Sequence, residues 1–109
     1  MALDETEDDE DRAAIAALWV GARERVLARI ALIDEALGRL TADGGDGDAR
    51  QEAVGESHKL AGSLGTFGVT EGSRLAKELE LLLLDGGDLG EAGRLCGELR
   101  AAVEAGPAT

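Results

Sequence analysis

The chain is short of the residues from which most metal and redox sites are built. Among its 109 residues it has one cysteine, one histidine, one proline, one tryptophan, one phenylalanine and no tyrosine. The single cysteine excludes a disulfide within the chain, and one cysteine with one histidine cannot complete a zinc site of the Cys/His type. We therefore expect no metal site in this chain, and a reducing compartment for its thiol.

Basic side chains are also scarce, since 11 Lys and Arg stand against 23 Asp and Glu, a net charge of -12. Such a charge repels nucleic-acid phosphates and anionic membrane surfaces, although it can equally serve solubility alone. The chain lacks the basic-then-apolar order of a secretory signal, and no apolar run approaches the roughly 18 residues that span a bilayer. We expect a cytoplasmic protein that binds neither nucleic acid nor membranes and is a monomer.

Alanine and leucine are abundant while β-branched and aromatic residues are sparse, which favours helices over strands. Apolar residues recur at steps of three and four through residues 12–40, the pattern of one long helix. Turn-forming Asp and Gly residues then separate three further helical segments, near residues 48–66, 70–85 and 88–105. The short connections predict an all-α, antiparallel up-down four-helix bundle.

The domain boundaries follow from the two ends of the chain. Seven of the first eleven residues are acidic and cannot pack against one another, so residues 1–11 are predicted to be a disordered leader, with a short extra helical segment as the alternative. The bundle is assigned to residues 12–105, and residues 106–109, which begin with Gly-Pro, to a tail or linker.

N-caps are predicted for three helices, because short polar side chains can accept the first free amide hydrogens of a helix. They are Asp46 or Asp48 for the second helix, Thr70 for the third and Asp88 for the fourth. Asp88 is followed three residues later by Glu91, the spacing of a capping box.

His58 is expected to lie on an open face of the second helix. At about 100° per residue, Leu60, Leu64 and Phe67 fall on the opposite side of that helix, so His58 faces water if they face the core. On the histidine's own side, the positions three, four and seven residues away carry Gly55, Ala61, Gly62 and Gly65, together with Val54.

Glycine inside a helix costs roughly 1 kcal/mol relative to alanine, so these glycines need a reason. One reason is close packing by a neighbouring helix, and the other is space for a partner's active site to reach the ring. Neutral imidazole is a nucleophile near pH 7, because its unperturbed pKa is about 6.5. Lys59 adds positive charge beside His58, which we interpret as an accessible nucleophile.

The segment Ser57–Val69, SHKLAGSLGTFGV, resembles the motif of histidine phosphotransfer (Hpt) domains, including the first domain of chemotaxis kinases. In that family a glycine follows the histidine by four residues and further glycines precede the next helix, and Gly62, Gly65 and Gly68 match these places. The resemblance implies that His58 takes a phosphoryl group from a receiver aspartate or a histidine kinase and passes it to a receiver aspartate. The chain is then a phosphoryl carrier in two-component signalling, not an enzyme.

The resemblance also implies roles for partners and for other residues. Response-regulator receiver domains and a histidine kinase are the expected partners, and they would supply Mg²⁺, since the carrier itself needs no cofactor. In similar domains a polar residue on the following helix holds the ring nitrogen that is not phosphorylated. Glu80 is the candidate here, with an ordinary solvated carboxylate as the alternative. Because family complexes bury an apolar patch beside the histidine, the surface around Leu64 and Val69 is expected to dock the receiver.

One departure from the family pattern concerns positive charge. Many members carry Lys three residues after the histidine, and this chain has Ala61 there. Lys59 could substitute only around the edge of the helix, because about 100° of rotation separates it from His58. Ala61 therefore supports the main alternative, an acidic helical adaptor that binds signalling proteins without chemistry.

Two other patterns are weaker. Gly62-x-x-Gly65-x-x-Gly68 lacks the Lys-Ser/Thr ending of a phosphate-binding loop and falls within a predicted helix. Asp43, Asp46 and Asp48 do not have the spacing of a calcium loop, and they are interpreted as turn and cap residues.

Overall fold

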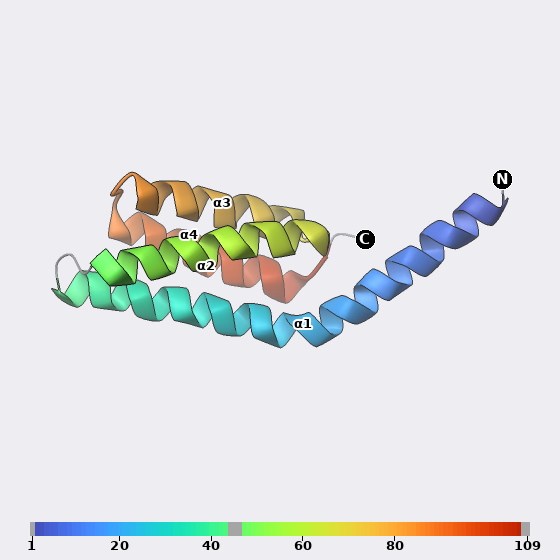
Figure 1. The fold of residues 1–109 in the computed structure, drawn as a ribbon, viewed down its shortest axis with the longest axis horizontal. Helices are drawn as coiled ribbons and strands as arrows, with labels where there is room; N and C mark the ends of the chain where they lie inside the picture. Colours follow the sequence, from blue (N-terminus) through green and yellow to red (C-terminus); the bar gives the residue numbers. More distant parts are fainter. Residues whose placement is uncertain (1, 44–46, 108–109) are drawn as a thin grey trace.

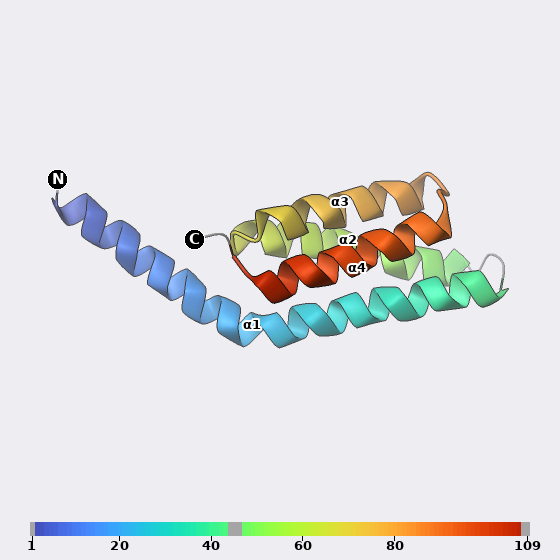
Figure 2. The ribbon, with the colours of Figure 1, turned by 180° about the vertical axis from the view of Figure 1, so that it is seen from behind.

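The protein is a four-helix bundle. The computed structural model describes residues 2–43 and 47–107, with side chains described at residues 10–42 and 47–107. Within these ranges the chain forms four helices and no strand: α1 (Ala2–Asp43), α2 (Gly47–Thr66), α3 (Thr70–Leu84) and α4 (Leu89–Ala105). Helices α1 and α3 each pack against both α2 and α4, and Figures 1 and 2 show that neighbouring helices run antiparallel. The predicted all-α, up-down four-helix bundle is confirmed.

The core is built from aliphatic side chains that all four helices contribute. The predicted stripe of α1 is buried from Trp19 to Leu40, and aliphatic residues of the other helices complete the core. The largest fully buried members are Ile30, Ile33, Leu60, Leu64, Leu79, Leu83, Leu99 and Val103. Because each stripe repeats at the helical period, burying it fixes which face of α2 remains in water.

The N-terminal part of α1 departs from the predicted disordered leader. The helix begins at Ala2, and Figure 1 shows this part diverging from the other three helices. Residues 10–18 are all exposed, so they add no buried side chain to the core. Its acidic sequence is nevertheless compatible with a helix start, because carboxylates are favourable near the positive end of the helix dipole. The extra helical segment is therefore a continuation of α1.

A tight turn joins α2 to α3. The Val69 amide donates to the Leu64 carbonyl at 2.9 Å, and the Gly68 amide donates to the Gly65 carbonyl at 3.2 Å. Gly68 has φ of 78°, the left-handed conformation that this Schellman arrangement requires. Leu64 and Val69 form the apolar pair that accompanies such a turn, and both are buried. The predicted break at residues 67–69 is confirmed.

Trp19 closes the end of the bundle at this turn. Its ring lies 5.4 Å from the ring of Phe67, with the two planes tilted by 57°. A side chain at Gly106, the residue that ends α4, would stand 3.6 Å from Trp19 Nε1. The two large aromatic residues of the chain thus join α1, the α2–α3 turn and the end of α4, and the tail predicted from residue 106 begins against the bundle.

The N-cap predictions have mixed outcomes. Asp88 is confirmed, since its Oδ2 accepts the Glu91 amide hydrogen at 2.9 Å. Thr70 is wrong, because Val69 occupies the N-cap position of α3 without a side-chain cap, as the Schellman turn leads directly into that helix. Asp48 lies within the first turn of α2, and Asp46 is outside the described residues.

Replacing Asp88 with alanine should lower the free energy of unfolding by about 1 kcal/mol, because the Glu91 amide loses its side-chain acceptor. Urea unfolding followed by circular dichroism measures the change. Asp85→Ala, an exposed residue at the other end of the same loop, is the matched control and should be nearly neutral. Equal losses in the two variants would contradict a capping role for Asp88.

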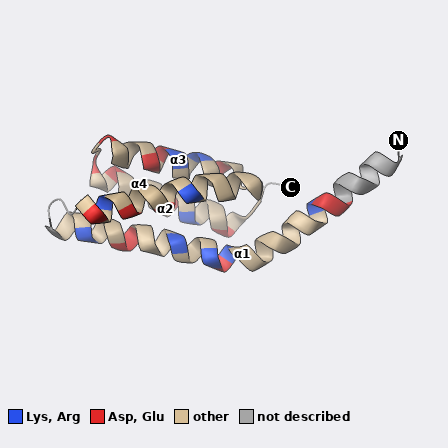
Figure 3. Cartoon of the chain, in the orientation of Figure 1, with Lys and Arg blue, Asp and Glu red and all other residues tan. Residues whose placement is uncertain are grey.

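Positively and negatively charged residues are interspersed along the described parts of the helices, as the colours in Figure 3 show. Ion pairs that join neighbouring helices include Arg29 with Glu56 at 2.9 Å, Arg39 with Glu52, and Arg100 with Asp34 at 2.7 Å. Each exposed pair contributes little to stability, so the apolar core carries the fold. Among the described residues, no helix is both long and apolar enough to cross a membrane.

Candidate functional site

His58 stands on the open face of α2, as predicted. Its side chain is 71% exposed, whereas the adjacent Ser57 and nearby Leu60 are buried in the bundle. Ser57 satisfies its hydroxyl within the helix by donating to the Ala53 carbonyl at 2.8 Å. The helical period therefore holds His58 toward water while its neighbours anchor α2 in the core.

Glu80 of α3 holds the His58 ring from the side. It is only 5% exposed, and its Oε2 lies 2.6 Å from His58 Nδ1. The structure therefore brings together the two residues that the sequence paired, and it excludes the alternative of an ordinary solvated carboxylate for Glu80.

The sequence interpretation missed Lys77, which lies one turn before Glu80 on α3. Lys77 Nζ donates to Glu80 Oε1 at 2.8 Å, so each carboxylate oxygen has its own partner. This Lys77 hydrogen bond is the main cause that holds the pKa of Glu80 below its ordinary value; burial opposes it, and His58 adds to it. The i,i+3 spacing of Lys77 and Glu80 was the available signal in the sequence.

The charge state of Glu80 determines the tautomer of His58. An ionised carboxylate can only accept hydrogen bonds, so the 2.6 Å contact requires that Nδ1 carries the hydrogen. In a neutral imidazole the lone pair available for attack is then on Nε2. The arrangement can therefore present a neutral imidazole whose reactive nitrogen is defined in advance.

The glycines beside His58 are not required for helix packing. A Cβ added at Gly55 or Gly62 would meet no atom within 4 Å, and one at Gly65 would meet only Ser73 Oγ, at 3.4 Å. Gly72 of α3 is different, since its Cβ would lie 3.0 Å from side-chain atoms of the α2–α3 turn. Of the two reasons considered for the α2 glycines, open space beside the histidine is the one that the geometry favours.

Lys59, the supporting cation predicted from the sequence, lies near a carboxylate of its own helix and not near Glu80. Its Nζ is 3.9 Å from Glu56 Oε1, and Glu56 also accepts from Arg29 of α1. Ala61 is partly buried, and its carbonyl accepts a hydrogen bond of 2.6 Å from Ser73 Oγ of α3. Positive charge on the α3 side of His58 therefore comes from Lys77 and not from α2.

The prediction that Leu64 and Val69 form the docking surface is wrong. They are 0% and 2% exposed, because they form the buried apolar pair of the Schellman turn. Exposed apolar surface lies instead at the other end of the site. Leu84 is 61% exposed, and with Val54 and Gly55 it lines a hollow of about 260 Å³. Val54 is one turn before His58 and Leu84 one turn after Glu80, so this hollow adjoins the pair.

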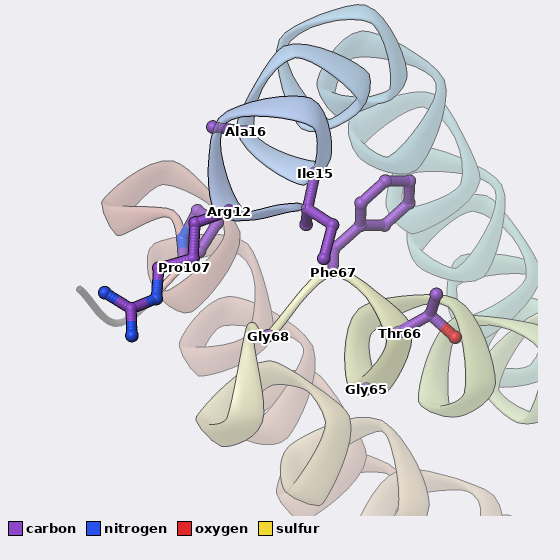
Figure 4. A pocket seen from close by; sticks show the side chains of 8 residues that line it. All are labelled: Arg12, Ile15, Ala16, Gly65, Thr66, Phe67, Gly68 and Pro107. Carbon is purple, nitrogen blue, oxygen red and sulfur yellow. The ribbon is translucent and has the colours of Figure 1, made fainter. Parts of the chain in front are cut away.

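A second hollow, of about 440 Å³, lies where the N-terminal part of α1 passes the α2–α3 turn (Figure 4). The side chains of Ile15 and Phe67 lie next to each other at its centre. The other lining residues are Arg12, Ala16, Gly65, Thr66, Gly68 and Pro107. Because Gly65 and Thr66 are about two turns beyond His58, the open face of α2 runs from the histidine to this hollow.

The remaining candidates for chemistry are the Cys96 thiol and groups of possible metal ligands. Cys96 is buried, and burial raises the pKa of its thiol to about 12, so it is protonated at neutral pH. No group of three or more His, Cys, Asp or Glu side chains in the described ranges could hold a metal ion. Of the aspartates considered for a calcium loop, Asp46 and the side chain of Asp43 lie outside those ranges.

Replacing Glu80 with glutamine should destabilise the fold in a pH-dependent way. Since folding lowers the pKa of Glu80, its ionised form stabilises the protein above the ordinary glutamate pKa of about 4.3, and this contribution is lost as the pH falls through the lowered value. We expect Glu80→Gln to cost about 1 kcal/mol at pH 7 and less near pH 3. Urea titrations at both pH values measure the difference.

Glu104→Gln, at an exposed position of α4, serves as the control and should have little effect at either pH. If Glu80→Gln cost the same at pH 7 and pH 3, the ionised carboxylate would not be the source of the stabilisation.

The fold and the site define a small helical phosphotransfer module: an antiparallel bundle with one exposed histidine, held through Nδ1 by a buried carboxylate. The family model described as Hpt domain matches residues 3–106. The chain belongs to the Hpt domain family, whose members are phosphocarrier modules of phosphorelay signalling that interact with receiver domains and kinases. Searches of curated proteins and of solved structures found no significant match.

Proposed function

We propose that His58 is the phosphorylated residue, which accepts a phosphoryl group from a receiver aspartate or a histidine kinase and delivers it to a receiver aspartate. The observation that carries this proposal is the bonding of an exposed imidazole through Nδ1 to the ionised Glu80. Nε2 is thereby left as the nucleophile on a face of α2 that the glycines keep open.

The transfer step involves two groups of this chain, the His58 ring and the Glu80 carboxylate. The Nε2 lone pair forms the N–P bond while the P–O bond to the donor breaks, and that electron pair remains on the departing aspartate carboxylate or on the departing ADP. The ring, which keeps its hydrogen on Nδ1, becomes positively charged. The carboxylate of Glu80 offsets that charge from 2.6 Å away, and the reverse step returns the lone pair to Nε2.

The partner is proposed to supply what this chain lacks. Charge neutralisation of the phosphoryl oxygens needs a metal ion or several cations, so Mg²⁺ is assigned to the receiver or kinase. We propose that the receiver docks over the apolar surface of Val54 and Leu84, which adjoins the His58–Glu80 pair and replaces the buried Leu64 and Val69 in that role.

Phosphotransfer from labelled receivers tests the proposal. The protein is incubated with receiver domains that carry ³²P-aspartyl phosphate, and the label that it takes up is treated with acid and with base. A phosphohistidine is acid-labile and base-stable, which is the expected result. A chain that binds receivers from a broad panel and takes label from none of them would be an adaptor, and the proposed function would be wrong.

A further inference from the structure

A third residue, Lys77, bonds to the carboxylate that holds His58. Each oxygen of the buried Glu80 carboxylate serves one neighbour, Oε2 the ring of His58 and Oε1 the ammonium group of Lys77. We propose that Lys77 is a positioning residue for phosphotransfer, which acts through Glu80 to keep the hydrogen of His58 on Nδ1 and the lone pair on Nε2. This inference rests on the proposed function of His58.

The register between α2 and α3 places Lys77 where it can bond to Glu80 without covering His58. His58 is paired with Glu80, and Gly65 faces Ser73, so the two helices are aligned antiparallel across this stretch. Lys77 lies between Ser73 and Glu80 on α3, beside the glycine-rich part of α2 that follows His58. Its side chain is about half exposed, so it reaches Glu80 from the solvent side.

No other described cation substitutes for Lys77 at Glu80. From α2, Lys59 is 3.9 Å from Glu56, and from α1, Arg29 donates to the same Glu56. On α3 itself, Arg74 is paired with Glu71 and Glu78. Within the described residues, the groups that bond to the Glu80 side chain are therefore His58 and Lys77.

Loss of Lys77 should change the protonation of the pair. Burial favours the neutral form of Glu80, and the Lys77 hydrogen bond is the main interaction that keeps its pKa low. A protonated Glu80 can donate a hydrogen bond to Nδ1 instead of accepting one. The neutral imidazole would then carry its hydrogen on Nε2, the nitrogen that must attack phosphorus.

Nitrogen NMR of His58 tests this directly, because it is the only histidine of the chain and its ring signals need no assignment. We compare the unmodified protein with Lys77→Met and Lys77→Arg between pH 6 and 8. The unmodified protein and Lys77→Arg should show neutral imidazole mainly in the Nδ1–H form, and Lys77→Met should gain the Nε2–H form. Lys59→Met is the control and should leave the tautomer unchanged.

The rate of label uptake from a phosphorylated receiver gives the second readout. For Lys77→Met we expect a fall of roughly fivefold or more in this rate, and for Lys77→Arg a rate near normal. A Lys77→Met protein with an unchanged tautomer overturns this inference, whatever its transfer rate. If the unmodified protein takes no label, the proposed function fails, while the NMR comparison still decides the role of Lys77.

Discussion

Replacing His58 with glutamine should abolish phosphoryl uptake completely. Glutamine keeps a polar side chain of similar length but has no nitrogen lone pair that can attack phosphorus, and the chain has no second histidine to take over. The expected result is a phosphorylated receiver that labels the unmodified protein and leaves His58→Gln without acid-labile label. No other substitution in this chain should have a larger effect on transfer.

The loss must be separated from unfolding. The His58 side chain is 71% exposed, and Glu80 keeps its bond to Lys77, so the unfolding free energy of His58→Gln should stay within about 1 kcal/mol of normal. Lys59→Gln, the exposed neighbour, is the matched control and should still be labelled. Label that persists in His58→Gln would place the phosphoryl group on another residue and contradict the assignment.

Replacing Gly62 with leucine should make the protein more stable and yet block transfer from a protein donor. Leucine forms helix better than glycine by roughly 0.5 to 1 kcal/mol, and a Cβ at Gly62 meets no atom within 4 Å. The new side chain lies one turn from His58 on the same face, where the receiver must bring its aspartyl phosphate to Nε2. We expect a drop of about a hundredfold in transfer from the receiver, while urea unfolding shows a rise in stability.

Two comparisons isolate the effect of access. Gly97→Leu introduces the same side chain into open space on α4, which does not pack against α2, so it should gain similar stability and transfer normally. Phosphoramidate, a small donor, should still phosphorylate His58 in Gly62→Leu, because it needs much less room than a receiver domain. Normal transfer from the receiver to Gly62→Leu would show that the open face is not needed for docking.

Most of the fold could be predicted from the sequence because its signals are local. The stripe from Trp19 to Leu40 repeats at the helical period, and burial of that stripe is what the structure shows. Asp88 with Glu91 at N3 marks a helix start that depends only on neighbouring backbone amides. The exposure of His58 follows from the same periodicity, since Leu60 and Leu64 lie on the opposite side of α2.

The partner of His58 was predictable only in part. Glu80 was found because the resemblance points to a polar residue on the following helix, and the 2.6 Å contact confirms the pairing. The extent of α1 was not predictable from charge alone, because an acidic segment that cannot pack can still continue a helix.

The sequence by itself determined the helices, the open face of α2 and the identity of the candidate nucleophile, since each depends on residues within a turn or two along the chain. Only the tertiary structure decided that Lys77 shares Glu80 with His58, that Val69 is buried, and that Leu84 lies beside the site. The physical reason is register: these contacts depend on how far α3 slides along α2, and the Schellman turn at Gly68 sets that distance.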